Sequence, residues 1–247
     1  MKTIILFGST GLLGWYIKNY LYNKYNLIII KRDTYDILND TYEKLKSLIE
    51  IHKPEYVINC TNSFRDTLKD MLLINSLFPQ RLDKLSKILK YTFIHISTNG
   101  VFSGYKGHYN EKDIEDANNN YGITKLLGEK IESIVIRTSI VGESSYNKDC
   151  IIEWLKKNKN NTIEGYTEHY WNGLTCLELA KYIEYIINNN IIWTGIRHIC
   201  SCNVLSKYQL IEYINNEYKL NMHIIPNNLN INKNQSYSLI IVLRLYY

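Results

Sequence analysis

Tyr121 and Lys125 are the residues of this 247-residue chain whose types and spacing point most directly to chemistry. On a helix, four residues make just over one turn, so the phenol and the ammonium group project from the same face. A cation beside a phenol favours the phenolate and lowers the pKa of the phenol from its ordinary value near ~10. The pair therefore suits proton transfer, although the same spacing also fits an ordinary aromatic near a helix start and a solvated surface charge.

A glycine-rich turn near the start of the chain is the second chemical motif. It reads Gly8-Ser9-Thr10-Gly11-Leu12-Leu13-Gly14, with a spacing of G-x-x-G-x-x-G instead of the dinucleotide fingerprint G-x-G-x-x-G. Glycines let the backbone approach a pyrophosphate, and the helix that follows supplies N–H groups and a partial positive charge. A tight turn without a ligand is the alternative. The position between a strand and a helix is the context that nucleotide binding requires.

Two basic residues, Lys31 and Arg32, directly follow the second apolar run. A carboxylate at this position would hold the ribose 2′-hydroxyl of NAD, whereas cations suit the 2′-phosphate of NADP. The sequence therefore predicts a preference for NADP, with NAD still possible because Asp33 is close. A solvated pair of basic residues is the structural alternative.

These motifs need a scaffold, and the chain supplies alternating strand and helix patterns. Runs rich in apolar residues, typical of strands buried on both faces of a parallel sheet, occupy residues 4–7, 27–30, 56–59, 93–96 and 134–137. Helical spacing lies between them, and Asp40 with Glu43 predicts a capping box for one of these helices. The alternation predicts an α/β fold with a doubly wound, Rossmann-type parallel sheet.

The character of the chain changes after Gly142. We predict a dinucleotide-binding domain over residues 1–142 and a smaller, mainly substrate-binding lobe over 143–221, with a possible return to the sheet at 196–200. Residues 222–247 are rich in asparagine and then apolar. Two interpretations of this segment stay open, a poorly ordered tail and an added edge strand.

Composition limits the classes of function. Hydrophobic residues make up 45% and charged residues 21% of the chain, as in ordinary globular proteins, and the net charge of +5 is spread along it. We therefore expect no nucleic-acid partner, and the apolar runs are too short for a membrane span. Five cysteines without framework spacing indicate reduced thiols. No targeting segment is visible, so a cytoplasmic protein is expected.

Taken together, these motifs resemble the extended short-chain dehydrogenase/reductase superfamily. More closely, Ile96-Ser-Thr-Asn-Gly-Val-Phe-Ser-Gly104 followed by Tyr121-Gly-Ile-Thr-Lys-Leu-Leu-Gly-Glu129 is similar to the dTDP-4-dehydrorhamnose reductase family. Val57-Ile-Asn-Cys60, Ile74-Asn75 and Val135-Ile-Arg-Thr-Ser139 extend the likeness. The resemblance implies an oxidoreductase that uses NAD(P)H to reduce the 4-keto group of a nucleotide-linked deoxysugar, as in rhamnose biosynthesis, and that forms a homodimer.

The resemblance also assigns roles to residues. Tyr121 would be the general acid, Lys125 would lower its pKa and bind the nicotinamide ribose, and Thr98 would hydrogen-bond the substrate oxygen. Asp36 and Ile37 would contact the adenine. The full predicted cofactor site comprises Gly8, Ser9, Thr10, Gly11, Leu12, Leu13, Lys31, Arg32, Asp36, Ile37, Asn59, Cys60, Thr61, Tyr121 and Lys125.

The substrate side is less determined by the sequence. The residues predicted to bind substrate are Asn99, Val101, Phe102, Arg137, Trp171 and Asn172. The aromatic run around Trp171 fits stacking on a base or sugar and fits a core equally well. Asn99-Gly100 replaces the Asp-Tyr pair usual in the family, which leaves the choice of sugar open. No metal site is predicted, because no ligand spacing surrounds His169.

Two other functions are compatible with this resemblance. The first is a combined 3-epimerase and 4-reductase, for which Cys60 and Cys176 are acid/base candidates only by elimination, since no cysteine lies between Thr98 and Tyr121. The second is an NADP-binding regulatory subunit without turnover. The presence of Thr98, Tyr121 and Lys125 together argues against the regulatory subunit.

Overall fold

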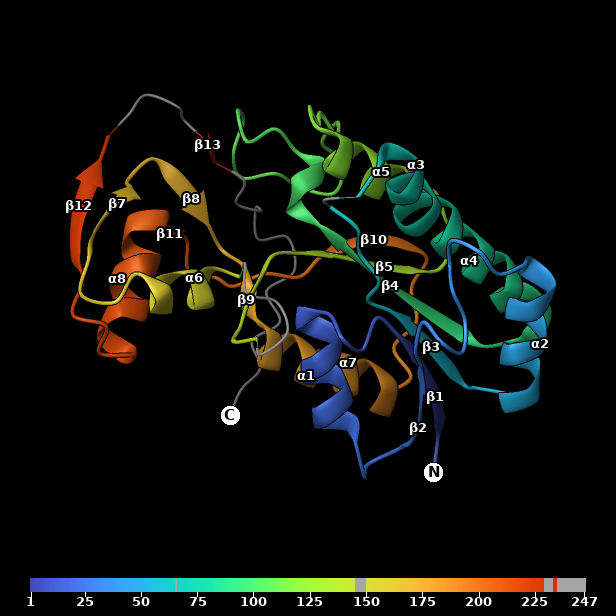
Figure 1. Cartoon of the computed structure of the whole chain (residues 1–247). Coiled ribbons are helices and arrows are strands. Elements are labelled where there is room, and N and C mark those ends of the chain that lie inside the picture. Colours follow the sequence, from blue (N-terminus) through green and yellow to red (C-terminus); the bar gives the residue numbers. More distant parts are fainter. Residues whose placement is uncertain (65, 145–149, 229–232, 235–247) are drawn as a thin grey trace.

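The central feature of the fold is a six-stranded sheet in which every neighbouring pair is parallel (Figure 1). The computed structural model describes residues 1–64, 66–144, 150–228 and 233–234. In spatial order the strands are β10 (Gly195–His198), β5 (Ile134–Thr138), β4 (Thr92–Thr98), β3 (Tyr56–Asn59), β1 (Thr3–Phe7) and β2 (Asn26–Ile30). The chain order reverses at β1, which lies between β2 and β3. The predicted doubly wound α/β fold is confirmed.

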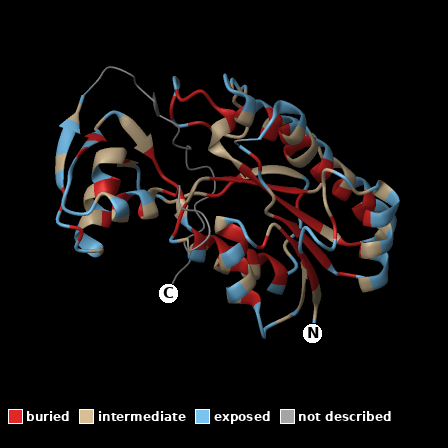
Figure 2. Cartoon of the chain, viewed as in Figure 1, coloured by how far each residue is buried: buried red, intermediate tan, exposed pale blue. Residues whose placement is uncertain are grey.

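Helices cover both faces of this sheet, as the alternation of apolar side chains along β1 requires. Ile4 and Leu6 face the helices α1 (Leu12–Leu21) and α7 (Cys176–Asn188), whereas Ile5 and Phe7 face α2 (Tyr42–His52) and α4 (Phe78–Leu89). Figure 2 shows the buried residues gathered in the strands and on the helix faces turned toward them. Such a sheet, buried on both sides, provides a rigid base for a site at its edge.

A π-helical stretch, η1 (Leu72–Leu77), joins α3 (Leu68–Met71) to α4, where Pro79 lies in the first turn. Its fully buried Asn75 accepts a hydrogen bond from the Ser63 backbone N–H at 2.9 Å and donates to the Ser63 carbonyl at 2.7 Å. Asn75 also donates to Thr124 Oγ1 at 3.1 Å, on helix α5 (Asn120–Gly128). One side chain therefore ties the loop after β3 to α5.

The C-terminal part forms a smaller lobe beside the sheet (Figure 1). Its core is formed by the helices α6 (Ile151–Lys157) and α8 (Lys207–Glu217) together with short strands. Leu155, Trp171 and Leu210 are among its buried residues. The remaining elements are β6 (Ile140–Val141), α6 (Ile151–Lys157), β7 (Thr162–Tyr166), β8 (His169–Trp171), β9 (Leu174–Thr175), β11 (Leu205–Ser206), α8 (Lys207–Glu217), β12 (His223–Asn227) and β13 (Lys233–Asn234).

Not all of residues 143–221 belongs to this lobe. Helix α7 packs on α1, and β10 pairs in parallel with β5 at the edge of the central sheet. In the segment 222–247, β12 pairs with β7 and β13 with β8, whereas residues 229–232 and 235–247 lie outside the described residues. Of the helices described, none is both long enough and apolar enough to span a membrane.

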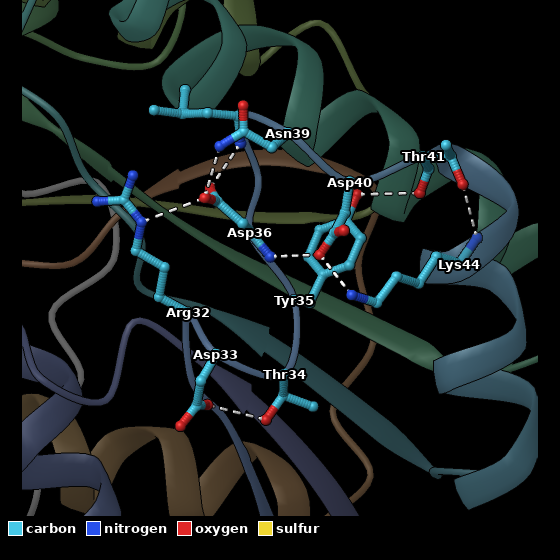
Figure 3. Close-up of polar contacts among 10 residues, drawn as sticks. Arg32, Asp33, Thr34, Tyr35, Asp36, Asn39, Asp40, Thr41 and Lys44 are labelled. Atoms are coloured by element: carbon cyan, nitrogen blue, oxygen red, sulfur yellow. Dashed lines mark hydrogen bonds and ion pairs between the residues drawn. The ribbon is translucent and has the colours of Figure 1, made fainter.

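The start of α2 differs from the prediction of a capping box at Asp40 and Glu43. Thr41 is the N-cap residue, and its hydroxyl accepts the backbone N–H of Lys44 at 3.2 Å. The Asp40 carboxylate instead accepts the Asp36 N–H and the Lys44 ammonium group, each at 2.7 Å (Figure 3). The prediction was wrong by one residue because Asp40 is used to close the preceding loop.

Candidate active site

A cavity of about 850 Å³ opens at the carboxyl ends of β1, β3 and β4, where the strand order reverses. Open α/β sheets bind ligands at such a point. The residues predicted for the site that line this cavity are Gly8, Ser9, Thr10, Gly11, Leu12, Leu13, Lys31, Arg32, Asp36, Ile37, Cys60, Thr61, Thr98, Tyr121 and Lys125. The structure thus brings the glycine turn, the basic pair and the Tyr-Lys pair to one cavity.

The glycine turn allows an unusually close approach of backbones. Gly8 has a φ of 81°, and a Cβ atom there would lie 2.6 Å from the carbonyl carbon of Cys60. A Cβ on Gly14 would lie 2.0 Å from the Gly8 oxygen, so neither position tolerates a side chain. Helix α1 begins after Gly11 without a side-chain cap, which leaves its first N–H groups directed to the cavity. This cradle fits the pyrophosphate of a dinucleotide.

The loop after β2 is closed by carboxylates (Figure 3). Asp36 accepts hydrogen bonds from Asn39 Nδ2 at 2.8 Å and the Leu38 N–H at 3.0 Å, and these bonds lower the pKa of its carboxyl group. Arg32 Nε lies 3.4 Å from Asp36 Oδ2, and three quarters of the Arg32 side chain is exposed. The ion pair holds a guanidinium group at the cavity rim, where it suits a phosphate.

Tyr121 lies in the first turn of α5 and is half-buried at the wall of the cavity. Burial raises the pKa of its phenol, while hydrogen bonds with the side chains of Thr98 and Asn62 act in the opposite direction. Thr98 is the last residue of β4, and its Oγ1 accepts the Gly100 N–H at 3.0 Å. The structure therefore places a protonated phenol next to a threonine hydroxyl in the cavity.

The Lys125 ammonium group is bound to a backbone carbonyl of β4, and the effect of its charge on the pKa of Tyr121 stays a prediction. Its Nζ donates to the Ile96 carbonyl at 2.8 Å. Burial lowers the pKa of Lys125 to about 8, and the negative charge of Glu129 opposes this shift. The ammonium group is thus bound to the residue two positions before Thr98 on β4, and its pKa is closer to neutrality than that of an ordinary lysine.

Asn59 and Cys60 follow one another at the end of β3 but differ in role. Asn59 is fully buried and does not line the cavity; its Oδ1 accepts the Thr61 N–H at 3.0 Å and the Thr61 hydroxyl at 2.7 Å. It therefore orients Thr61, which does line the cavity. Cys60 lines the cavity as well, and burial raises the pKa of its thiol to about 12.

Three of the predicted substrate residues are buried elsewhere. Val101 and Phe102 belong to a small core, in which the Phe102 ring stacks on Tyr109 at a centroid distance of 4.2 Å. Both are predicted to bind substrate, but they follow a 3₁₀ turn over Asn99–Val101 and pack into this core instead of lining the cavity. Asn99 itself is half-buried next to Thr98 and outside the residues that line the cavity.

Arg137 is the third of these residues, and it is completely buried. Its guanidinium group makes a bidentate pair with Glu129, with Nε 3.0 Å from Oε1 and Nη2 2.6 Å from Oε2, and it also pairs with Glu115. With two carboxylates bound, it is not directed into the cavity. The prediction that Arg137 binds substrate is wrong.

Trp171 and Asn172 lie outside the residues that line the cavity. The Trp171 indole Nε1 donates to Ser139 Oγ at 2.7 Å, and both side chains are almost fully buried. Ser139 lines the cavity, as does Asn62, and the sequence interpretation missed both. A signal was present in each case, since Asn62 is a polar residue just beyond the end of a central strand, and Ser139 follows β5 within one of the motifs that carried the resemblance.

Comparison with known proteins places the chain in a family. The family model described as "RmlD substrate binding domain" matches residues 1–236. Among curated proteins, methionine adenosyltransferase 2 subunit beta from Xenopus laevis is 29% identical over 140 residues, which are 52% of this chain and 42% of the relative. The chain therefore matches less than half the length of that relative.

Solved structures of similar fold include reductases of nucleotide sugars. A dTDP-4-dehydrorhamnose reductase from Bacillus anthracis, in complex with NADP, has a TM-score of 0.81 at 18% identity, covering 92% of this chain and 84% of that one. A hypothetical dTDP-4-dehydrorhamnose reductase from Sulfolobus tokodaii has a TM-score of 0.79 at 23% identity, covering 96% and 92%. These likenesses show the fold. Since the family model spans nearly the whole chain, the protein belongs to the RmlD substrate binding domain family.

Proposed function

We propose that the protein reduces the 4-keto group of a nucleotide-linked deoxysugar of the dTDP-4-dehydrorhamnose type, with NADPH as the reductant. The observation that carries this proposal is the hydrogen-bonded pair of Thr98 and Tyr121, in the same cavity as Lys125 and the glycine turn. The fold that the chain shares with nucleotide-sugar reductases supports the same class of substrate.

In the proposed reaction the nicotinamide cofactor supplies a hydride to the ketone carbon. The turn from Gly8 to Gly14 would hold its pyrophosphate, and Lys125 its nicotinamide ribose. Thr98 would orient the ketone oxygen by a hydrogen bond, and Tyr121 would donate its proton to that oxygen as the alcohol forms. Because burial keeps the Tyr121 phenol protonated, the residue is prepared for the role of acid.

The basic pair Lys31 and Arg32 supports NADP over NAD, and the reductase from Bacillus anthracis is described in complex with NADP. We expect Arg32→Ala to weaken NADPH binding about 10-fold and to leave NADH binding unchanged, because only NADPH carries the 2′-phosphate. Titration of nicotinamide fluorescence measures both dissociation constants. Lys159→Ala, which removes one exposed cation from the C-terminal lobe, is the control. Equal weakening for the two cofactors would contradict the assignment.

A cofactor-binding subunit without turnover is the second candidate. It is favoured by the match to methionine adenosyltransferase 2 subunit beta, a protein named as a subunit of an enzyme from another class. This candidate predicts tight NADPH binding without turnover. It assigns no role to the hydrogen bond between Thr98 and Tyr121.

A combined epimerase and reductase has less support. Cys176 is fully buried on α7 and does not line the cavity, and burial raises its pKa to about 12. Cys60 does line the cavity, but its thiol is held protonated in the same way. Neither thiol is suited to removing a proton beside the ketone.

One assay separates these functions. The protein is mixed with NADPH and a 4-keto-6-deoxy nucleotide sugar, and the loss of nicotinamide absorbance is followed. Oxidation of NADPH that depends on the sugar is expected for the reductase. Tight NADPH binding with no oxidation for any such sugar would favour the non-catalytic subunit, and exchange of the proton beside the ketone with solvent would reveal epimerisation.

The setting in which we propose this reaction is a cytoplasmic homodimer. All five cysteines are unpaired, as in a reducing compartment. Exposed apolar side chains gather on the adjoining elements α3, η1 and α5, where Leu68, Leu72 and Ile123 are 49%, 38% and 43% exposed. Burying this surface against a second copy would remove it from water. Sedimentation velocity tests this: a species of twice the chain mass is expected, and a monomer at micromolar concentration would contradict it.

A further inference from the structure

Helix α5 ends at Glu129, a buried carboxylate to which the reaction above assigns no role. Glu129 follows Lys125 by four residues, as Lys125 follows Tyr121, and only 3% of its surface is exposed. Its Oε1 accepts a hydrogen bond from Ser97 Oγ, and both of its oxygens pair with Arg137. A buried carboxylate is costly unless it is fully paired, so these contacts define its position closely.

Two residues of α5 and its C-cap residue, Glu129, contact three successive residues of β4. Lys125 donates to the Ile96 carbonyl, Glu129 accepts from the Ser97 hydroxyl, and Tyr121 is hydrogen-bonded to Thr98. Tyr121, Lys125 and Glu129 lie one turn apart along the same helix face. The hydrogen bond between Ser97 and Glu129 therefore holds the C-terminal end of α5 against β4, the strand that carries Thr98.

Arg137 anchors Glu129 from the neighbouring strand. On β5, Arg137 is the register partner of Ser97 on β4, so Glu129 bridges two adjacent strands. Arg137 also pairs with a second carboxylate, that of Glu115 in the loop before α5. Two carboxylates thus share one guanidinium group, but of the two only Glu129 contacts Ser97 in the described structure.

We propose that Glu129 is a positioning residue of the active site, which holds the Lys125 side chain and the end of β4 in register through Ser97 and Arg137. The proposal rests on the proposed reduction, in which Lys125 and Thr98 act directly. Glu129 itself contacts neither the substrate nor the cofactor in this scheme.

The charge of Glu129 gives the proposal a measurable consequence. The groups that act on Lys125 are Glu129 on the same helix, Cys60 after β3 and the fully buried His95 on β4. Burial and the charge of Lys125 lower the pKa of His95, which is therefore neutral, and the Cys60 thiol is protonated. Glu129 is then the charged neighbour that keeps Lys125 protonated. Removing its charge lowers the pKa of Lys125 further, so the cation is lost at a lower pH.

We expect Glu129→Gln to lower kcat about 10-fold and to move the alkaline limb of the kcat profile about one pH unit toward acid. Glu115→Gln is the matched control, because it removes the other carboxylate from Arg137. We expect it to leave the limb in place. Glu129→Asp should recover the position of the limb. Thermal unfolding of each variant reports any loss of stability separately.

The dissociation constant of NADPH, measured against pH by fluorescence, is the readout that needs no turnover. If the wild type never oxidises NADPH, the proposed reduction fails, but a shifted pH dependence of binding in Glu129→Gln alone still supports the role of Glu129. An unmoved limb in Glu129→Gln, or equal movement in Glu115→Gln, overturns the proposal. If Glu129→Gln does not fold, Ser97→Ala decides: it keeps every charge, and an unchanged kcat overturns the role.

Discussion

Replacing Tyr121 with phenylalanine is expected to lower kcat by about 10²–10⁴-fold, because it removes the proton donor and keeps the ring. The phenol is the group that Thr98 and Asn62 hydrogen-bond within the cavity, and no other phenol in the described part of the chain is bonded to Thr98. The binding of NADPH should change by no more than a few-fold, since the glycine turn and the basic pair remain. Steady-state kinetics with the sugar and fluorescence titration with NADPH measure the two quantities.

Tyr213→Phe is the matched control for this experiment. Tyr213 lies on α8, and 71% of its surface is exposed, so loss of its hydroxyl should leave kcat unchanged. If Tyr121→Phe retains a rate within a few-fold of the wild type, Tyr121 is not the proton donor. A loss of NADPH binding equal to the loss of rate would instead assign the residue to the cofactor.

The second large effect is on stability, and it concerns Arg137. Arg137→Met leaves the carboxylates of Glu129 and Glu115 in a buried site without their cation, which typically costs about 3–5 kcal/mol. Denaturant unfolding should show this loss of free energy. Arg32→Met is the control: its side chain is exposed in an ion pair with Asp36, and such pairs contribute about 0–1 kcal/mol. A loss for Arg137→Met no larger than for Arg32→Met would contradict the buried network.

The pH dependence of this effect has a definite sign. Burial raises the pKa of Glu115, but the hydrogen bond and charge of Arg137 outweigh it, so the pKa is lowered from the ordinary value of 4.5. A carboxyl group with a lowered pKa in the folded state stabilises the fold above its unfolded pKa. That contribution is lost as the pH falls through the folded value. The difference in stability between wild type and Arg137→Met should therefore shrink on acidification below about pH 4.5.

The parts of the molecule that follow from local pattern could be predicted from the sequence. Apolar runs such as residues 4–7 are long enough to mark buried strands, and the glycines at 8 and 14 are required by backbone contacts that only glycine permits. Tyr121 and Lys125 lie on one turn of one helix, so their common face follows from spacing alone. Most of these features depend on residues close together in the chain, whereas the contact of Gly8 with the Cys60 backbone was not needed to recognise the glycine motif.

The errors arose where a residue depends on a distant partner. The sequence predicts that Arg137 is a cation at the rim of the site, because its ion pair with Glu115, 22 residues away, cannot be inferred from spacing. Val101 follows Thr98 by only three residues, yet its direction depends on a 3₁₀ turn and on Tyr109 packing nearby. Likewise, the acceptor of the Lys125 ammonium group, the Ile96 carbonyl, is supplied by another element. Spacing carries no information on these contacts.

Asn75 has a consequence for how the site opens. Its amide bonds the backbone of Ser63 in both directions and also bonds Thr124, one residue before Lys125. A loop that borders the cofactor cavity and the helix that carries Tyr121 are thereby joined at a fully buried point. We expect the two segments to open as one cooperative unit in hydrogen exchange, with the Ser63 amide protected as strongly as the amides of α5.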